Sequence, residues 1–281
     1  MKEDKLNSII HGDPLVMQPE VNNPYRVALG YIWNRIFWDL RLSSWVSRSR
    51  LKRKKGGMSG KKAVILCNGP SLLAVDFNKL AEAGVFTFGL NKINLLFESV
   101  DYKPNCIVAV NKFVIEQNAD FFNATDIDLY LDYVARKKCI VKPKENIIYL
   151  HSSGVPKFAK DVSLSVQQGH TVTFVAMQLA FHMGFSEVAL VGADHSFAEK
   201  GPANKVVVSS DVDKSHFSPD YFSKGVSWQL PDLYESEVWY GRARLVYEAH
   251  GRKIYNCTEG GLLEVFQRTT IDRFLQNSSD C

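Results

Sequence analysis

The chain has 281 residues, 46% apolar and 23% charged, a composition typical of a soluble globular protein of one large domain or two small ones. The formal charge of +4 is mild, and its basic residues cluster between Arg41 and Lys62, which argues against nucleic-acid binding. The five cysteines form no CxxC pair, which argues against a disulfide framework or a zinc site. With no visible signal peptide and no apolar run near the ~18 residues that span a bilayer, we expect a cytoplasmic protein.

The N-terminal region, residues 1–57, differs from the rest of the chain. Residues 1–23 are polar and aperiodic, which indicates a loose arm. Residues 24–51 predict one basic amphipathic helix, followed by a cationic run and Gly56-Gly57. Its apolar face consists of Leu29, Ile32, Trp33, Ile36, Phe37 and Leu40. Residues 24–55 therefore suit an anionic membrane surface, on the inner face of the cytoplasmic membrane, or packing against the body or a second subunit in a homo-oligomer.

Residues 58–281 show the alternation of predicted strands and helices that is typical of an α/β domain. Apolar runs predict strands at 63–67, 85–90, 106–110, 129–133, 147–150, 187–192 and 253–257. Helical periodicity predicts helices at 76–83, 112–122, 171–183 and 235–250. Strands that alternate with helices imply a mostly parallel sheet with helices on both faces. Residues 195–233 are polar and rich in Ser, Pro and Gly, which is typical of a lid, a binding loop or disorder.

Polar residues follow the predicted strands, at the edge where open α/β sheets bind their ligands. Asn68, Asn91 and Asn111 follow the first three strands, and Asp194, His195 and Ser196 follow the strand at 187–192. Asn is common at turns, but three in register favour a site for nucleobase edges, sugar hydroxyls or phosphate.

The first turn, Asn68-Gly69-Pro70-Ser71, is neither a Walker P-loop nor a GxGxxG fingerprint. It could still hold a phosphate through the amides of Gly69 and Ser71 and the Ser71 hydroxyl. Thr171 or Thr173 can cap the helix that follows, whose N-terminus also offers amides to an anion.

Candidates for acid–base chemistry lie in the long loop. His216, Asp220 and Tyr221 are titratable groups there, and His195 is a second histidine candidate. Two Asp-x-Asp triplets, at Asp126 and at Asp211, could hold a divalent cation. The first precedes a strand and so belongs at the opposite edge of the sheet, and we predict no metal.

These motifs resemble those of the Campylobacter-type bacterial sialyltransferases and the related motility-associated factor glycosyltransferases, which share a domain with archaeal 6-hydroxymethylpterin diphosphokinases. The resemblance covers residues 61–266. It is carried by Asn68-Gly69-Pro70-Ser71-Leu72, Asn91, Asn111, Gly184-Phe185-Ser186-Glu187, Gly192-Ala193-Asp194 and Ser215-His216-Phe217. The sialyltransferases have Thr-Ser-Gly where this chain has Thr171-Val172-Thr173. In the sialyltransferases the catalytic histidine comes a few residues after the segment that resembles Ser215-His216-Phe217. The nearest equivalent in this chain is Asp220.

The resemblance implies a Rossmann-like domain that transfers a nonulosonic acid, such as sialic acid, from a CMP-sugar to a glycan or lipopolysaccharide-type acceptor. It implies no cofactor beyond the donor. The asparagines would contact CMP, Thr171 to Thr173 its phosphate or the sugar carboxylate, and His216 or Asp220 the acceptor hydroxyl. Two alternatives remain at this stage, an ATP-dependent pyrophosphokinase acting on a pterin and a membrane-associated, non-catalytic sugar-binding protein.

Overall fold

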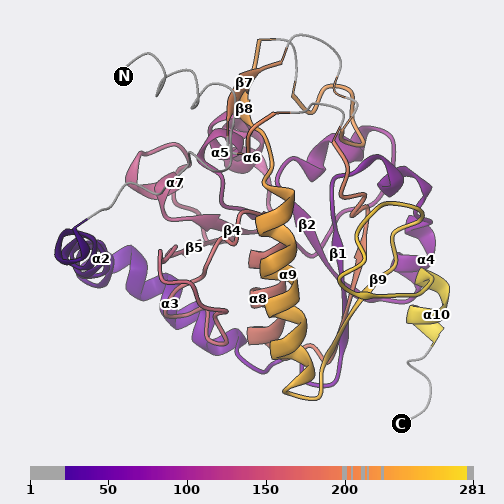
Figure 1. Cartoon of the computed structure of the whole chain (residues 1–281), viewed down its shortest axis with the longest axis horizontal. Helices are drawn as coiled ribbons and strands as arrows, with labels where there is room; N and C mark the ends of the chain where they lie inside the picture. The colour runs from indigo at the N-terminus through magenta and orange to yellow at the C-terminus, as the bar shows by residue number, and fades with distance from the viewer. Residues whose placement is uncertain are drawn as a thin grey trace, which may run out of the picture.

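A parallel sheet lies at the centre of the protein, with the strand order β10-β9-β6-β1-β2-β3-β4-β5 (Figure 1). The computed structural model describes residues 23–197, 201–203, 205–209, 213, 215–222 and 225–276. Every neighbouring pair in this sheet is parallel. The strands are β1 Lys62–Leu66, β2 Phe86–Leu90, β3 Cys106–Ala109, β4 Asp128–Asp132, β5 Ile147–Leu150, β6 Glu187–Val191, β9 Lys253–Asn256 and β10 Gln267–Arg268.

Helices cover both faces of the sheet, as predicted. The α-helices are α2 Pro24–Asp39, α3 Leu42–Lys54, α4 Phe77–Glu82, α5 Lys112–Gln117, α6 Ala119–Ala124, α7 Val134–Lys137, α8 Val172–Met183, α9 Leu233–Glu248 and α10 Ile271–Gln276. Two 3₁₀ helices, η1 Pro70–Ala74 and η2 Ile93–Glu98, follow β1 and β2. One core contains residues of α3, α8 and α9, and the other contains residues of α4 to α7 and α10.

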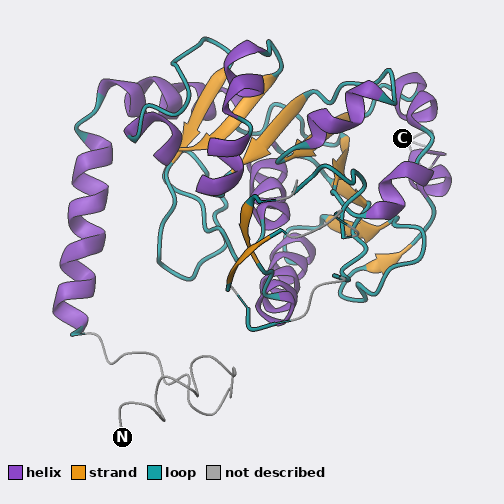
Figure 2. Cartoon of the chain, turned by 90° about the horizontal axis from the view of Figure 1, so that it is seen from above, coloured by secondary structure: helices purple, strands orange, loops and turns teal. Residues whose placement is uncertain are grey.

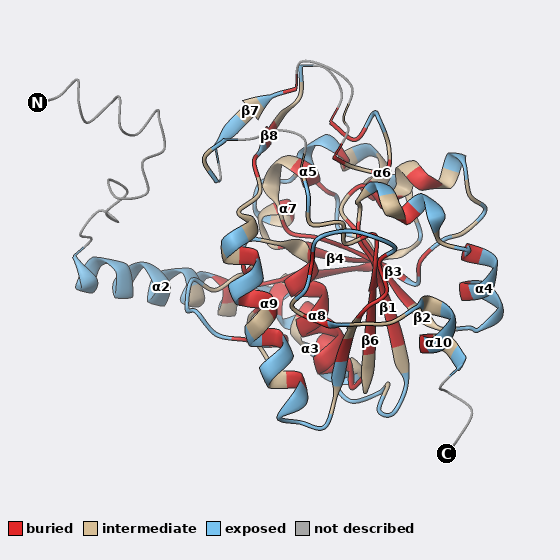
Figure 3. Ribbon diagram, turned by 45° about the vertical axis from the view of Figure 1, so that its right-hand side comes forward, coloured by how far each residue is buried: buried red, intermediate tan, exposed pale blue. Residues whose placement is uncertain are grey.

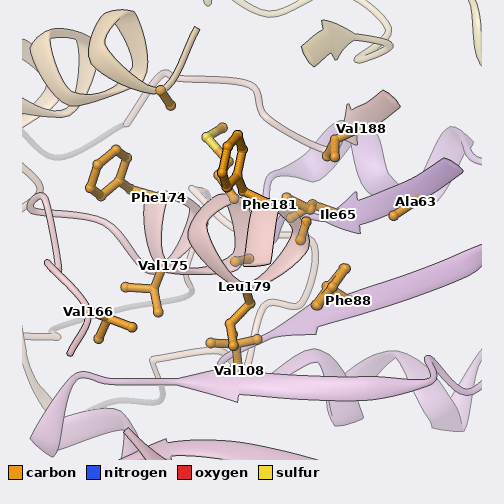
Figure 4. Close-up of a cluster of buried hydrophobic side chains, with 14 of the residues drawn as sticks. Ala63, Ile65, Phe88, Val108, Val166, Phe174, Val175, Leu179, Phe181 and Val188 are labelled. Atoms are coloured by element: carbon orange, nitrogen blue, oxygen red, sulfur yellow. The ribbon is translucent and has the colours of Figure 1, made fainter. Parts of the chain in front are cut away.

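Alternation along the central strand explains the two cores. Ala63 and Ile65 of β1 face the α8 side, whereas Val64 and Leu66 face the opposite side, and all four are fully buried. Figure 4 shows Ile65 beside Phe181 and Leu179 of α8. A strand buried on both faces must be apolar at every position, which is why β1 appears in the sequence as a continuous apolar run.

The helix α8 is enclosed by the rest of the protein. Thr171 accepts a hydrogen bond from the amide of Thr173 and caps its N-terminus, and Gly184 ends it in the left-handed conformation at φ 104°. Residues 173–183 are all buried, between the sheet on one side and α9 on the other (Figure 3). This packing fixes the N-terminus of α8 at the edge of the sheet where β1 and β6 end.

The strand order places the topological switch point between β1 and β6. From β1 the chain runs outward through β2, β3, β4 and β5, and then returns so that β6 pairs with the other side of β1. A crevice opens outside the carboxyl ends of strands at such a point and is the usual ligand site of this architecture. The turn after β1 and the loop after β6 are therefore the walls of the expected site.

Most predicted elements are confirmed, and two predicted helices are wrong in extent. Each predicted strand agrees with an observed one to within one residue at either end. The helix predicted over 24–51 is divided into α2 and α3, because Arg41 adopts an extended backbone at φ −104° and ψ 135°. The helix predicted over 112–122 is divided into α5 and α6. The predicted loop 195–233 contains an antiparallel hairpin of β7 Val206–Val208 and β8 Ser227–Gln229.

The two N-terminal helices differ in how they contact the body. The inner side of α3 is packed: Leu51 lies in the core beside α8, and Ser47 Oγ accepts a hydrogen bond from the amide of Tyr149 of β5. Helix α2 extends outward from the body, as seen at the left of Figure 2. Within the described ranges, no helix is both long enough and apolar enough to cross a bilayer.

Candidate active site

Two adjoining cavities lie at the carboxyl end of the sheet. The first, here called the switch-point cavity, has about 720 Å³ of empty space, part of it open to solvent, between the turn after β1 and the loop after β6. The second, here called the hairpin-side cavity, has about 1230 Å³ and lies between the ends of β2 and β3, the residues before α8 and strand β8. Both are lined by Asn91, Thr171, His216 and Tyr221.

The structure brings together eleven of the thirteen residues that the sequence predicts for the site. The switch-point cavity is lined by Asn68, Gly69, Asn91, Thr171, Thr173, Asp194, His195, Ser196, His216 and Tyr221. Asn111 lines the hairpin-side cavity. Neither cavity is lined by Ser71 or Asp220. The convergence follows from parallel strands ending at one edge of the sheet.

The turn after β1 holds a carboxylate of the protein itself. Asp194 Oδ2 accepts a hydrogen bond from Ser71 Oγ at 2.7 Å, and the Ser71 amide approaches both carboxylate oxygens at 3.3 Å. The Gly69 amide donates to the carbonyl of Gly192 at 2.9 Å. The sequence suggests that these donors bind a phosphate. In the structure they instead join the β1 turn to the β6 loop.

The three asparagines occupy different environments. Asn111 caps α5 by accepting from the amide of Phe113 at 2.8 Å, and it also donates to Gln229 of β8. Asn68 Nδ2 donates to the Leu90 carbonyl and the Tyr221 hydroxyl. The Oδ1 atoms of Asn68 and Asn91 are buried and have no hydrogen-bond partner among the described residues. A buried acceptor without a partner is costly, so a ligand that donates N–H or O–H groups would satisfy both.

The N-terminus of α8 forms the floor between the two cavities. Val172 lines both, and Thr171, the capping residue, also contacts the Tyr240 hydroxyl at 3.3 Å. The thiol of Cys67 lies 3.8 Å from Thr173 Oγ1, and burial raises its pKa to about 12. A thiol with that pKa stays protonated near neutral pH, so Cys67 is not a nucleophile there.

A histidine–aspartate pair lies in the wall that the cavities share. His216 Nδ1 lies 2.8 Å from Asp213 Oδ2, and the imidazole stacks on the Tyr221 ring with centroids 3.9 Å apart. The carboxylate can only accept, so Nδ1 carries the proton and Nε2 of the neutral ring is an acceptor. Burial alone would raise the pKa of Asp213, but the hydrogen bond and charge of His216 lower it.

The structure separates the two candidate bases. Asp220 is exposed, lies outside both cavity walls, and its amide donates to Ser218 Oγ at 3.3 Å. The His216 side chain is 12% exposed and borders both cavities. Phe197, Phe222 and Trp228 meet its ring edge-on. Only His216 is positioned to reach a molecule bound in either cavity.

A second histidine–carboxylate pair flanks the switch-point cavity. His195 Nε2 lies 2.9 Å from Glu237 Oε1 of α9, and the His195 backbone is in the left-handed region at φ 55°. This conformation is uncommon outside glycine and is typical of positions whose surroundings determine it. Glu237 therefore orients His195, and Ser196 beside it is exposed.

Sequence reasoning missed several residues of the site. Lys92, after β2, is buried and donates through Nζ to the carbonyl of Tyr221 at 2.7 Å, which fixes the segment that carries His216. Burial lowers the pKa of Lys92 to about 8. Tyr240 and Glu237 come from α9, and only their spacing on that helix could have pointed to them. The sequence places Asp213 in an Asp-x-Asp triplet that could hold a cation, whereas in the structure it is the partner of His216.

The Asp-x-Asp triplets lie outside the cavities. Asp126 is fully exposed and pairs with Lys144, and Asp128 begins β4 and pairs with Lys54. Both are at the amino end of the sheet, as the sequence predicted. Asp211 lies outside the described residues, and the described part of the chain contains no group of three His, Cys, Asp or Glu residues suited to a metal.

Comparison with a solved structure gives a distant match. The MAf glycosyltransferase from Magnetospirillum magneticum AMB-1 has 15% sequence identity and a TM-score of 0.47 to this protein. The match covers 81% of this chain and 38% of the other, so the chain spans less than half the length of that protein. No curated protein matches the sequence.

Comparison with family models gives a match to a family described as 6-hydroxymethylpterin diphosphokinase MptE-like, over residues 41–200. The matched region begins at α3 and includes β1 to β6, the turn at Asn68 and the loop at Asp194. It therefore contains both walls of the topological switch point and more than half of the chain. The protein that carries this cavity belongs to the MptE-like family.

Proposed function

We propose that this protein is a glycosyltransferase that moves a sugar from a CMP-activated donor to a hydroxyl of a glycan or lipid-linked acceptor. The observation that carries the proposal is the His216–Asp213 pair in the wall shared by two polar cavities. One cavity would hold the donor and the other the acceptor, which leaves His216 between them. The motif resemblance noted in the sequence favours a nonulosonic acid as the sugar.

The base in this proposal is His216. Asp213 holds its Nδ1 proton, and Nε2 takes the proton of the acceptor hydroxyl as that oxygen attacks the anomeric carbon. The new bond forms as the bond from the anomeric carbon to the phosphate oxygen breaks, and CMP leaves with the bonding electrons. Direct displacement of this kind inverts the anomeric configuration. The carboxylate of Asp213 stabilises the imidazolium that results.

The side-chain amides of Asn68 and Asn91, after the first two strands, would recognise the nucleotide. Their Oδ1 atoms have no donor among the described residues, and the cytosine amino group and the ribose hydroxyls could supply one. The N-terminus of α8 would face the departing phosphate, because helix N-termini favour negative charge. The Ser71 and Gly69 amides have no part in this proposal, since protein groups already occupy them.

The family match supports a second candidate, a pyrophosphokinase that transfers diphosphate from ATP to a pterin. Such a reaction needs Mg²⁺, which takes several oxygen ligands, usually carboxylates together with phosphates and water. Among the described residues, Asp194 is the one carboxylate that lines either cavity, and it is bound to Ser71. These residues do not fit a metal–ATP site, so we rank this candidate second.

A thermal-shift screen separates the candidates. Ligands that bind only the folded state raise the unfolding temperature with concentration. We expect CMP and CMP-sialic acid to stabilise the protein, and UDP-sugars and ATP with Mg²⁺ to have little effect. Stabilisation by ATP with Mg²⁺ alone would reject the transferase, and no stabilisation by any nucleotide would favour a non-catalytic sugar-binding protein.

A matched pair of histidine variants tests the base. His216→Ala should lower the rate of sugar transfer from CMP-sialic acid by about 10²–10⁴-fold. The control is His250→Ala, because His250 is exposed at the end of α9, away from both cavities. Equal turnover in the two variants would remove His216 from the mechanism.

A further inference from the structure

The outward side of α2 and α3 is an unusual surface, because α2 contacts the body through few residues and leaves most of its large apolar side chains exposed. Asn34 Oδ1 lies 2.7 Å from His151 Nε2, and Arg35 donates to the carbonyl of Leu164. Trp38 is buried at 2% exposure. Trp38 lies three and four residues after Arg35 and Asn34, so the three side chains share the side of α2 that faces the body.

The opposite face of α2 is apolar and exposed. Its members recur at helical spacing along the whole helix, and they are Tyr25, Leu29, Ile32, Trp33, Ile36, Phe37 and Leu40. Phe37 is 58% exposed and Leu40 77%. Figure 3 shows α2 as mostly exposed while the strands are buried. A contiguous apolar surface of this kind is rare on a monomer unless it binds something.

The surface continues onto α3 and changes character along it. Leu42, Trp45 and Val46 extend the apolar face, because the chain turns only briefly at Arg41 and Trp45 Nε1 donates to the carbonyl of Asp39. The next positions on the same face of α3 are Ser49, Lys52 and Arg53. The outer face of α2 and α3 thus runs from apolar residues, through a tryptophan, to exposed cations.

Charge indicates what covers this surface. Between Pro24 and Lys55 the chain has nine basic residues and one acidic residue, Asp39, which is paired with Arg35 and Arg48. Lys52 and Arg53 have no carboxylate partner among the described residues, and with Trp45 they line a shallow hollow. A second copy of the chain would bring the same cations to the contact and no free carboxylate to meet them. An anionic lipid surface supplies both the apolar layer and the opposite charge.

We propose that the outer face of α2 and α3 docks onto an anionic membrane surface. The apolar residues of α2 enter the boundary between headgroups and acyl chains, with α2 lying in the membrane plane. Trp33 and Trp45 lie at the headgroup level, where indole rings are favoured. Lys52 and Arg53 contact the lipid phosphates from the hollow on α3. This surface does not involve the cavity residues, so it is independent of the reaction proposed above.

Co-sedimentation of the full chain with lipid vesicles tests the proposal. The chain should bind phosphatidylglycerol-containing vesicles, bind pure phosphatidylcholine vesicles much less, and lose binding as salt rises. Trp33→Ser with Phe37→Ser should lower partitioning about tenfold or more. Lys52→Glu with Arg53→Glu should abolish the preference for the anionic lipid.

The controls use residues of the same kind on other surfaces. Leu245→Ser with Leu262→Ser removes two exposed apolar side chains outside α2 and α3, and Lys253→Glu with Lys137→Glu reverses two exposed lysines. These variants should bind like the wild type. The proposal is wrong if the two sets of variants bind alike, or if binding ignores lipid charge. It is also wrong if sedimentation without lipid shows a dimer that Trp33→Ser with Phe37→Ser dissociates.

Discussion

The carboxylate of Asp194 fills the space beside Gly69 that a side chain would otherwise occupy. A Cβ built on Gly69 would overlap Asp194 Oδ2 and lie 2.7 Å from the carbonyl oxygen of Gly192. Glycine at this position therefore allows the loop after β6 to approach the turn after β1. Ser71 then holds the carboxylate in place through its hydroxyl. The turn after β1 therefore binds the loop after β6 directly.

Gly69→Ala should consequently destabilise the fold and distort the site together. We expect a loss of about 1–3 kcal/mol in the free energy of unfolding, as for other overpacked positions, measured by urea titration. The rise in unfolding temperature that we expect from CMP should also disappear. Gly241→Ala is the matched control, because Gly241 is inside α9 with nothing within 4 Å of the added Cβ. It should stabilise the protein by about 0.5–1 kcal/mol.

Asp213→Asn should impair catalysis while preserving the shape of the pair. An asparagine amide can donate to Nδ1 of His216, which would move the ring proton to Nε2 and remove the base. Turnover should fall by about 10²–10⁴-fold in a transfer assay. Asp126→Asn, at the opposite end of the sheet, should leave turnover unchanged. Wild-type rates in Asp213→Asn would show that His216 acts without its partner, or not at all.

The same substitution has a pH signature in stability. Because His216 lowers the pKa of Asp213 in the folded state, its ionised form contributes stability above the pKa of the unfolded chain, near 3.8. That contribution is lost as pH falls through the lower folded pKa. The stability difference between wild type and Asp213→Asn should thus shrink as pH falls through the lowered pKa of Asp213. Urea titrations of both proteins at several acidic pH values measure this difference in the free energy of unfolding.

Lys92 should make stability rise in mild alkali. Its folded pKa, about 8, lies below the ordinary value of 10.5, because burial disfavours the charged form. Below pH 8 the folded protein bears the whole cost of burying the ammonium group. Between about pH 8 and 10.5 the unfolded chain binds more protons, so stability increases with pH, by up to about 1.4 kcal/mol per pH unit. Lys92→Met should lack this rise, and the exposed control Lys61→Met should retain it.

His151 should make the attachment of α2 sensitive to acid. Burial, and then the charge of Arg35, lower the pKa of His151 to about 4, so the neutral ring is the form that contacts Asn34. As pH falls from about 6.5 toward 4, His151 becomes protonated in the unfolded chain but stays neutral in the folded protein, so the free energy of unfolding declines. His151→Gln should remove this part of the decline in urea unfolding. His250→Gln, an exposed position, should not.

Seven of the eight strands of the central sheet could be predicted from the sequence, because buried strands are apolar at most of their positions. The run at 63–67, for example, is bounded by Lys62 and Asn68, so its ends could also be predicted. Parallel order then placed Asn68, Asn91 and Asp194 at one edge of the sheet. The hairpin of β7 and β8 was missed since these strands are only three residues long, and β7 is partly exposed.

Partners across the fold were beyond the reach of the sequence. The sequence predicts a ligand-binding role for Asp194 at a strand end, and only the folded structure shows that its carboxylate accepts a hydrogen bond from Ser71. Periodicity identified the apolar face of α2 but could not say that this face turns outward, because that depends on contacts such as Asn34 with His151. The break between α2 and α3 had no Pro or Gly to mark it.

The position of β1 has a consequence for how the molecule forms. Lys62 of β1 pairs with Glu187 of β6 although nearly half of the chain separates them. Strands β1 to β5 are joined by short connections and can pair early. The pairing of β6 with β1 closes a loop of nearly half the chain, so the second wall of the cavity should form later. During synthesis the turn at Asn68 would emerge long before the loop at Asp194 that completes it. The chain should therefore complete the switch-point cavity in a late refolding step, after most of its helical signal has already returned.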